Sequence, residues 1–152
     1  MTDNFNVSIT LTGNLFDPQK IQQATKESIE NTGAFLLAEL FLLANSGKNA
    51  DNQPLQPYSA WYQAIRQNKG LSLAPNFQFT SSMLNSLTIM SKNDNSFIIG
   101  VIGIDVNGMS NALKLQKTQQ IKNYYLLRAT VYLSNKVAKF FEGQLISKLT
   151  GV

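Results

Sequence analysis

The sequence predicts an α+β domain, in which a small, mostly antiparallel sheet is packed by a long N-terminal helix and a C-terminal helix. Residues 18–44 contain no proline after position 18, which suits one long helix. Apolar and polar residues alternate over 5–11, and two aliphatic segments, 87–91 and 97–104, flank a turn rich in Asn and Asp. Because there is no internal repeat, 152 residues suit a single domain over 1–152.

The first two elements are a strand and the long helix. The period of two over residues 5–11 indicates a strand with one buried face. Asp17 followed by Pro18 is a helix N-cap with proline at the first helical position, so we expect the helix to cover 18–44. Gly33 is its one potential weak point, because glycine disfavours a helix interior.

The second half of this helix is apolar on nearly every side. Residues 34–44 (AFLLAELFLLA) contain a single charged residue, Glu39. A helix of this kind has to be covered on more than one side, so it either crosses the centre of the molecule or lies in a subunit interface. The run is too short for a membrane span, which needs about 20 apolar residues, and we expect no membrane contact.

The middle of the chain predicts a loop and two short helices. Residues 45–57 are rich in turn-forming residues and are expected to connect without packing. Residues 59–69 place apolar side chains at helical spacing and end at Gly70, a typical residue after a helix C-terminus. A hydroxyl residue at 80–82 is expected to cap a further helical turn before the hairpin.

The hairpin and the C-terminal region complete the predicted order. Strand 97–104 is apolar on both faces, so we expect it to be the central strand. Residues 111–123 fit neither period well and are left open between a helix and an extended arm. Residues 124–133 are rich in Tyr, Leu and Val and predict a strand. Ser134 is then expected to cap a final helix that ends at Gly151.

Composition argues against catalysis. The chain has no histidine and no cysteine, which removes the commonest general base, the commonest metal ligand and a thiolate nucleophile. Gly100 and Gly103 fall inside a predicted strand and do not form a phosphate-binding loop. We therefore expect a protein that is not an enzyme and that uses no cofactor or metal. Only 14% of residues are charged, whereas 16 are Asn and 12 are Gln, and a surface with so little charge tolerates contact with copies of itself.

Charge is uneven along the chain. Residues 1–105 have six Lys or Arg against eight Asp or Glu, whereas residues 106–152 have seven against one. This basic third either lines a channel through which DNA passes, meets an acidic partner ring, or is a solvated helix face. The candidate contacts are Lys114, Lys117, Lys122, Arg128, Lys136 and Lys139.

Five residues are candidates for a subunit interface. Tyr58, Trp61 and Tyr62 offer large aromatic area, although such side chains also serve to pack a short helix on a sheet. Glu39 interrupts the apolar half of the long helix, so it either pairs with a basic group, including one from another subunit, or reaches the surface. Phe41 belongs to the same apolar half and is the fifth candidate.

Four segments carry a resemblance to a known family. Residues 52–62 (NQPLQPYSAWY), 66–70 (RQNKG) and 79–87 (FTSSMLNSL) resemble the phage virion morphogenesis families, the tail completion and neck proteins. Those families show G-x-P-(F/L)-x-P-L-S-x-x-Y-x-x-x-K-x-x-G, then L-x-x-T-G-x-M-x-x-S, then a β-hairpin. Tyr62 stands at the position of the family's tyrosine, and residues 128–134 (RATVYLS) look like the family's R-P-F-L-x-L-S segment.

The resemblance implies a structural role in a tailed bacteriophage. The expected protein is a ring-forming subunit, often hexameric, at the head-tail junction, of the neck, tail-terminator or tail-completion type. Its partners would be copies of itself and the adjacent neck, tail-tube or connector proteins, with DNA passing without sequence specificity. Its place would be the virion, after assembly in the host cytoplasm. The alternative from composition alone is a small basic nucleic-acid-binding protein.

Overall fold

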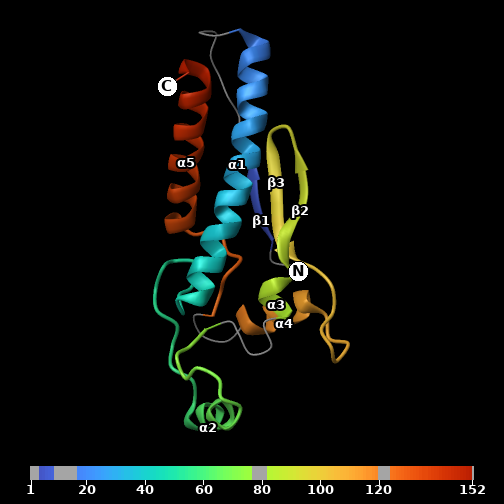
Figure 1. Cartoon of the computed structure of the whole chain (residues 1–152), viewed down its shortest axis with the longest axis vertical. Coiled ribbons are helices and arrows are strands. Elements are labelled where there is room, and N and C mark those ends of the chain that lie inside the picture. The colour runs from blue at the N-terminus through green and yellow to red at the C-terminus, as the bar shows by residue number, and fades with distance from the viewer. Residues whose placement is uncertain (1–3, 9–16, 77–81, 120–123, 152) are drawn as a thin grey trace.

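The computed structural model describes residues 4–8, 17–76, 82–119 and 124–151. Its elements follow the order β1, α1, α2, α3, β2, β3, α4, α5 (Figure 1). A three-stranded antiparallel sheet lies on one side of α1 and α5 lies on the other. The predicted α+β class, with a long N-terminal and a C-terminal helix beside a small sheet, is confirmed.

Helix α1, Pro18–Asn45, runs along the body of the molecule (Figure 1). The carboxylate of Asp17 accepts a hydrogen bond from the backbone N–H of Gln19 at 2.8 Å, and Pro18 starts the helix as predicted. Leu36 and Leu40 are completely buried in the core. Of the two explanations for the apolar second half, the structure therefore supports the helix that crosses the centre of the fold.

Gly33 lies where α1 packs on the sheet. A Cβ at this position would lie 3.1 Å from the Cδ1 atom of Ile89 and 3.5 Å from the ring of Phe97. Glycine therefore lets the helix approach the sheet more closely than a larger residue would allow.

The sheet has the strand order β1-β3-β2, with β1 at Phe5–Ser8, β2 at Leu87–Asn93 and β3 at Ser96–Val101. The prediction that the second hairpin strand is central is confirmed, although it ends at Val101 instead of 104. The last part of the predicted first strand, 9–11, lies outside the described residues.

The C-terminal region differs from the prediction in one element. The predicted strand 124–133 is wrong, because its described residues up to Thr130 form no strand and helix α5 already covers Val131–Thr150. Thr130, not Ser134, caps this helix, and its hydroxyl accepts the backbone N–H of Leu133 at 3.2 Å. The end of α5 at a left-handed Gly151 is confirmed.

The Tyr, Leu and Val pattern that suggested a strand reflects burial in the core. Leu126 and Leu127 are almost completely buried, and the carbonyl of Tyr125 accepts a hydrogen bond from the N–H of Ala50 at 2.9 Å. This segment therefore pairs with the loop after α1 and not with the sheet. The ambiguous segment that follows β3 is helical where it is described, as α4 at Asn111–Gln119.

Helix α5 runs alongside α1 and packs against it (Figure 1). The rings of Phe35 and Phe140 stack at 4.1 Å between centroids, and Val137 and Phe141 are buried nearby. Within the described residues, no helix has the length and the apolar run that a membrane crossing needs.

Candidate assembly surface

Residues 46–76 form an arm that extends from the C-terminal end of α1 to one end of the molecule (Figure 1). Helix α2, Ala60–Asn68, lies at the tip of this arm, apart from the sheet and the long helices. The short helix predicted over 59–69 is therefore confirmed. Helix α3, Ser82–Asn85, confirms the helical turn predicted before the hairpin; the possible caps at 80 and 81 lie outside the described residues.

The base of the arm packs against the body. Ala50 and Leu55 are buried, so the expectation that 45–57 connects without packing is wrong. The amide oxygen of the buried Asn49 accepts hydrogen bonds from the backbone N–H groups of Asp51 and Gln53, both at 3.0 Å. These bonds satisfy the turn internally, which fixes the direction in which the arm leaves α1.

Arg66 is the centre of the arm. Only 1% of this residue is exposed, and its Nε donates to the backbone carbonyl of Ser72 at 2.7 Å. A second guanidinium nitrogen donates to the amide oxygen of Asn76 at 3.4 Å, and the guanidinium carbon lies 4.9 Å from the centroid of the Tyr58 ring. Arginine suits this position because its planar group both donates in a fork and stacks on aromatic rings.

Two tyrosines complete the arm around this arginine. Tyr58 and Tyr62 meet edge to face at 5.0 Å, and the Tyr58 hydroxyl donates to the carbonyl of Asn76 at 2.6 Å. The N–H of Asn76 donates back to that hydroxyl at 2.8 Å. Burial raises the pKa of Tyr58, so the hydroxyl keeps its proton and stays a donor. Tyr62 therefore packs α2 within the arm, and Tyr58 contacts both Tyr62 and the hydrophobic core.

Tyr124 ties the arm to the body. Its hydroxyl donates to the backbone carbonyl of Gln56 at 2.5 Å, and its ring stacks on that of Tyr58 at 6.3 Å. Burial raises the pKa of Tyr124 to about 12, so this hydrogen bond persists throughout the neutral range. Noncovalent contacts thus hold the base of the arm to the body and connect the segments of the arm to one another.

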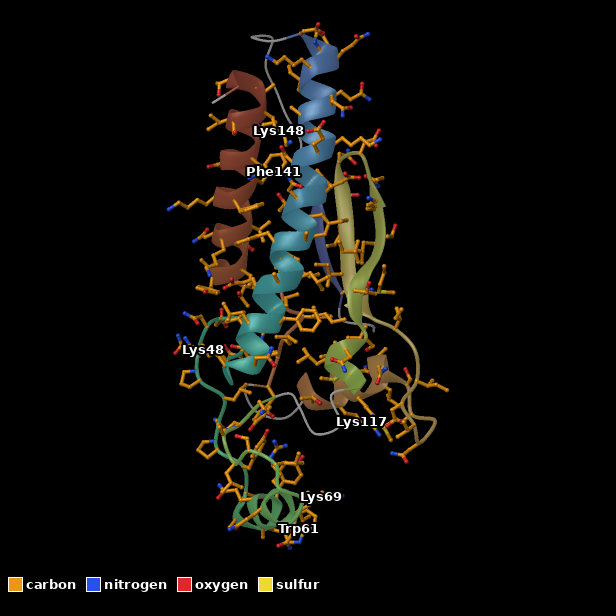
Figure 2. The ribbon with its side chains drawn as sticks, viewed as in Figure 1. Lys48, Trp61, Lys69, Lys117, Phe141 and Lys148 are labelled. Carbon is orange, nitrogen blue, oxygen red and sulfur yellow. The ribbon has the colours of Figure 1, made fainter. Side chains whose placement is uncertain are left out.

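Trp61 lies on the outside of the arm. It is 74% exposed, and Figure 2 shows it beside α2 at the end of the molecule. The interpretation that this side chain packs its helix on the sheet is therefore wrong. The arm, which has its own hydrogen-bond network, therefore presents a large exposed aromatic side chain, and such side chains serve as anchors in protein interfaces.

Glu39 has a partner in the same chain. It is buried, and its Oε1 atom forms an ion pair with Lys136 of α5 and accepts a hydrogen bond from the Tyr132 hydroxyl at 3.1 Å. The hydrogen bond to Glu39 raises the pKa of Lys136. No basic group from another subunit is needed to satisfy this carboxylate, which joins α1 to α5. Phe41 is partly buried and packs against the core.

The five candidate DNA contacts that the structure describes are divided between ion pairs and separate elements. Lys114 is paired with Asp105 and Lys136 with Glu39, so their charges are locally balanced. Lys122 lies outside the described residues. The three others are exposed on separate elements: Lys117 on α4, Arg128 before α5 with its guanidinium 5.0 Å from the Tyr125 ring centroid, and Lys139 on α5.

Sequence reasoning missed the role of Arg66. The available signal was the spacing of four between Tyr62 and Arg66, which places these two side chains on the same face of α2. Among the described residues, no group of three Asp or Glu side chains is arranged to hold a metal ion. Comparisons of the chain with models of protein families, with curated proteins and with solved structures find no match.

Proposed function

We propose that this chain is a structural subunit of a tailed bacteriophage that assembles into a ring at the head-tail junction, as a neck, tail-terminator or tail-completion protein. The observation that carries the proposal is Trp61, which is 74% exposed on an arm held rigid around Arg66. Aromatic side chains of this kind dominate the energy of protein interfaces.

The rigidity of the arm supports the proposal. Ordering flexible groups on binding costs free energy. An interface segment that is already ordered avoids this cost and binds more tightly. The hydrogen bonds from Arg66 and Tyr58 to the segment after α2 supply that order before any partner arrives. None of these contacts involves the Trp61 side chain, which leaves it available to a partner.

The shape of the molecule suits stacked rings. The arm extends along the long axis of the molecule, whereas α5 and the sheet form its flanks (Figure 1). In this arrangement copies of the chain, six in the proposed ring, contact one another through their flanks, and the arm reaches a neighbouring neck, tail-tube or connector protein. DNA passes through the ring without sequence-specific contacts. The proposed location is the virion, after assembly in the host cytoplasm.

The alternative, a small nucleic-acid-binding protein, has less support. Its candidate residues are spread over α4, α5 and the segment between them, and two of the lysines are paired with carboxylates. If duplex DNA were the main partner, its affinity would fall steeply with added salt, because each phosphate contact releases a counterion.

The mass of the purified protein in solution tests the proposal. Light scattering at low and high salt should give one discrete assembly of about six copies, with little dependence on salt because the proposed contacts are mainly apolar. A single chain at every accessible concentration would contradict self-assembly. In that case salt-dependent binding to duplex DNA would favour the alternative.

A further inference from the structure

An exposed apolar loop connects β3 to α4. Residues 102–110 place Ile104 and Val106 in solvent, with exposed fractions of 70% and 91%, and Ile102 and Met109 are also exposed. The loop lies on the opposite side of the molecule from α5 (Figure 1). Exposing four apolar side chains of one short loop to water is unfavourable. Covering them in an assembly would lower the free energy.

The loop is held in shape by Asp105. The buried carboxylate of this residue accepts backbone hydrogen bonds from Asn107 at 2.9 Å and Met109 at 2.8 Å, and it forms an ion pair with Lys114. The N–H of Asp105 also donates to the carbonyl of Met109 at 2.9 Å. The loop thus satisfies its polar groups internally and keeps its apolar side chains outside.

The ends of the loop are fixed as well. The side-chain amide of Asn111 donates to the carbonyl of Ile102 at 3.0 Å, and its N–H donates to the carbonyl of Gly103 at 3.1 Å. Gly103 and Gly108 have positive φ angles of 76° and 77°, which favour glycine at both bends. The loop is therefore a preformed apolar projection.

A cavity of about 530 Å³ lies between β1 and α5. Its apolar lining includes Val7 from the edge strand β1 and Val137, Phe141 and Leu145 from α5. The volume is large enough for several aliphatic side chains, since pockets of roughly 300–1,000 Å³ bury whole small ligands.

We propose that the apolar loop of one copy inserts into the cavity between β1 and α5 of the next copy, with Ile104 and Val106 as the inserted side chains. Because the loop and the cavity are different surfaces, the contact is head-to-tail, and repetition of a head-to-tail contact generates a ring when the rotation closes. The inference rests on the proposed function and assigns the surfaces that join the copies.

Charge complementarity argues for a second copy as the occupant. Lys117 is exposed on α4, the helix that follows the loop, and lies on the same helix face as the exposed Leu113 four positions earlier. Glu142 lines the cavity and is exposed. The loop side of the contact therefore carries a positive charge and the cavity side a negative one. When the loop of one copy enters the cavity of the next, this pair of opposite charges favours one orientation of the contact.

Substitutions on the two surfaces test the inference in the full chain. Val106→Asp and Ala138→Asp, the latter at an exposed lining position of the cavity, should each raise the concentration needed for ring assembly at least tenfold. Leu73→Asp, at an exposed apolar position in the arm, is the matched control and should assemble like the wild type. Circular dichroism of each variant verifies that the fold is kept.

Mixing the two variants distinguishes a head-to-tail contact between copies from a symmetric contact. In an equimolar mixture, the intact cavity of the Val106→Asp chain meets the intact loop of the Ala138→Asp chain. The mixture should give a complex of two chains and no ring, because every other pairing lacks one surface. Rings formed by either variant alone at wild-type concentration would overturn the inference.

Cross-linking gives an independent readout, because the natural chain has no cysteine. Under mild oxidation, a Val106→Cys/Ala138→Cys chain should form a ladder of disulfide-linked copies up to the ring. A mixture of the two single variants should give linked pairs only.

Absence of cross-links from wild-type-like rings would contradict the inference but not the proposed ring. A wild-type protein that stays monomeric would overturn both. Binding of an apolar small molecule to the cavity, with assembly unchanged by the substitutions, would assign the cavity to a ligand instead.

Discussion

The body and the arm of this molecule are stabilised in different ways. In the body, completely buried aliphatic residues such as Leu36, Leu40 and Ile99 join α1 to the sheet, and Leu133 adds α5. In the arm, the most deeply buried side chain of α2 is Arg66, which is held by two carbonyl-type oxygens and two tyrosine rings. Apolar burial produces a stable scaffold, whereas a polar network fixes the shape of a segment that has little apolar surface to bury.

This contrast predicts two levels of stability. Segments with few buried apolar contacts open locally at lower free energy than the core. The arm should therefore exchange its amide hydrogens faster than α1 and still be ordered in the native state. The four predictions that follow test this difference between body and arm, in order of decreasing expected effect.

Leu40→Ala should have the largest effect. It removes a completely buried side chain between α1 and the rest of the core, and such truncations lower the free energy of unfolding by about 2–5 kcal/mol. Urea unfolding measures the loss. Leu42→Ala, at a 61% exposed position on the same helix, is the control and should change stability by less than about 0.5 kcal/mol. Equal losses for the two variants would contradict the assigned core.

Arg66→Ala should destabilise the arm without unfolding the body. It removes charged hydrogen bonds to Ser72 and Asn76, each of the kind worth about 1.5–3 kcal/mol. Hydrogen exchange should become faster throughout α2, while the amides of α1 and the sheet keep their protection. Gln67→Ala, at the exposed neighbouring position, should leave exchange in α2 unchanged. Loss of protection across the whole chain would show that arm and body unfold as one unit.

Glu39→Gln should lower the free energy of unfolding by about 1–2 kcal/mol at neutral pH, because it weakens a charged contact between α1 and α5. The pKa of Lys136 is raised in the folded protein, chiefly by its hydrogen bond to Glu39. The stabilisation is therefore present below the ordinary pKa of lysine and is lost as pH rises through the raised value.

The stability of the wild type should consequently fall more steeply above pH ~10.5 than that of Glu39→Gln. Thermal unfolding across this range measures the difference. Lys139→Gln, at an exposed lysine of the same helix, should keep the wild-type profile. Parallel profiles for the wild type and Glu39→Gln would show that the ion pair does not control the alkaline transition.

Trp61→Ala should have the smallest effect on the fold and a clear effect on binding. An exposed side chain contributes less than about 0.5 kcal/mol to stability. If the arm docks on an adjacent ring protein as proposed, the variant should bind that protein at least tenfold more weakly. Because Trp61 is the single tryptophan, its fluorescence in the wild type should shift to shorter wavelength when the arm docks. Unchanged emission when the chain binds the adjacent ring protein would exclude the arm from that interface.

Local signals made much of the fold predictable. Asp17 and Pro18 mark the start of α1, and the turn between the two aliphatic segments of the hairpin is evident from its Asn and Asp residues. The strand predicted over 124–133 failed because Leu126 and Leu127 are buried by contacts that are distant in the sequence, and burial alone gives the same apolar pattern as a strand.

The candidate surface was only partly predictable for the same reason. Trp61 was evident as a large aromatic residue, but its exposure depends on the arm leaving the body. The pairing of Glu39 with Lys136 joins positions 97 apart, which no sequence period connects. The burial of Arg66 depends on the chain returning at Ser72 and Asn76, which no local sequence pattern indicates.

Electron microscopy of the purified wild-type protein tests the central claim most directly. We expect closed rings of uniform copy number with a central opening, in which the arms project from one face. Single copies at all accessible concentrations, or filaments without closure, would contradict the proposal that this chain functions as a ring-forming subunit.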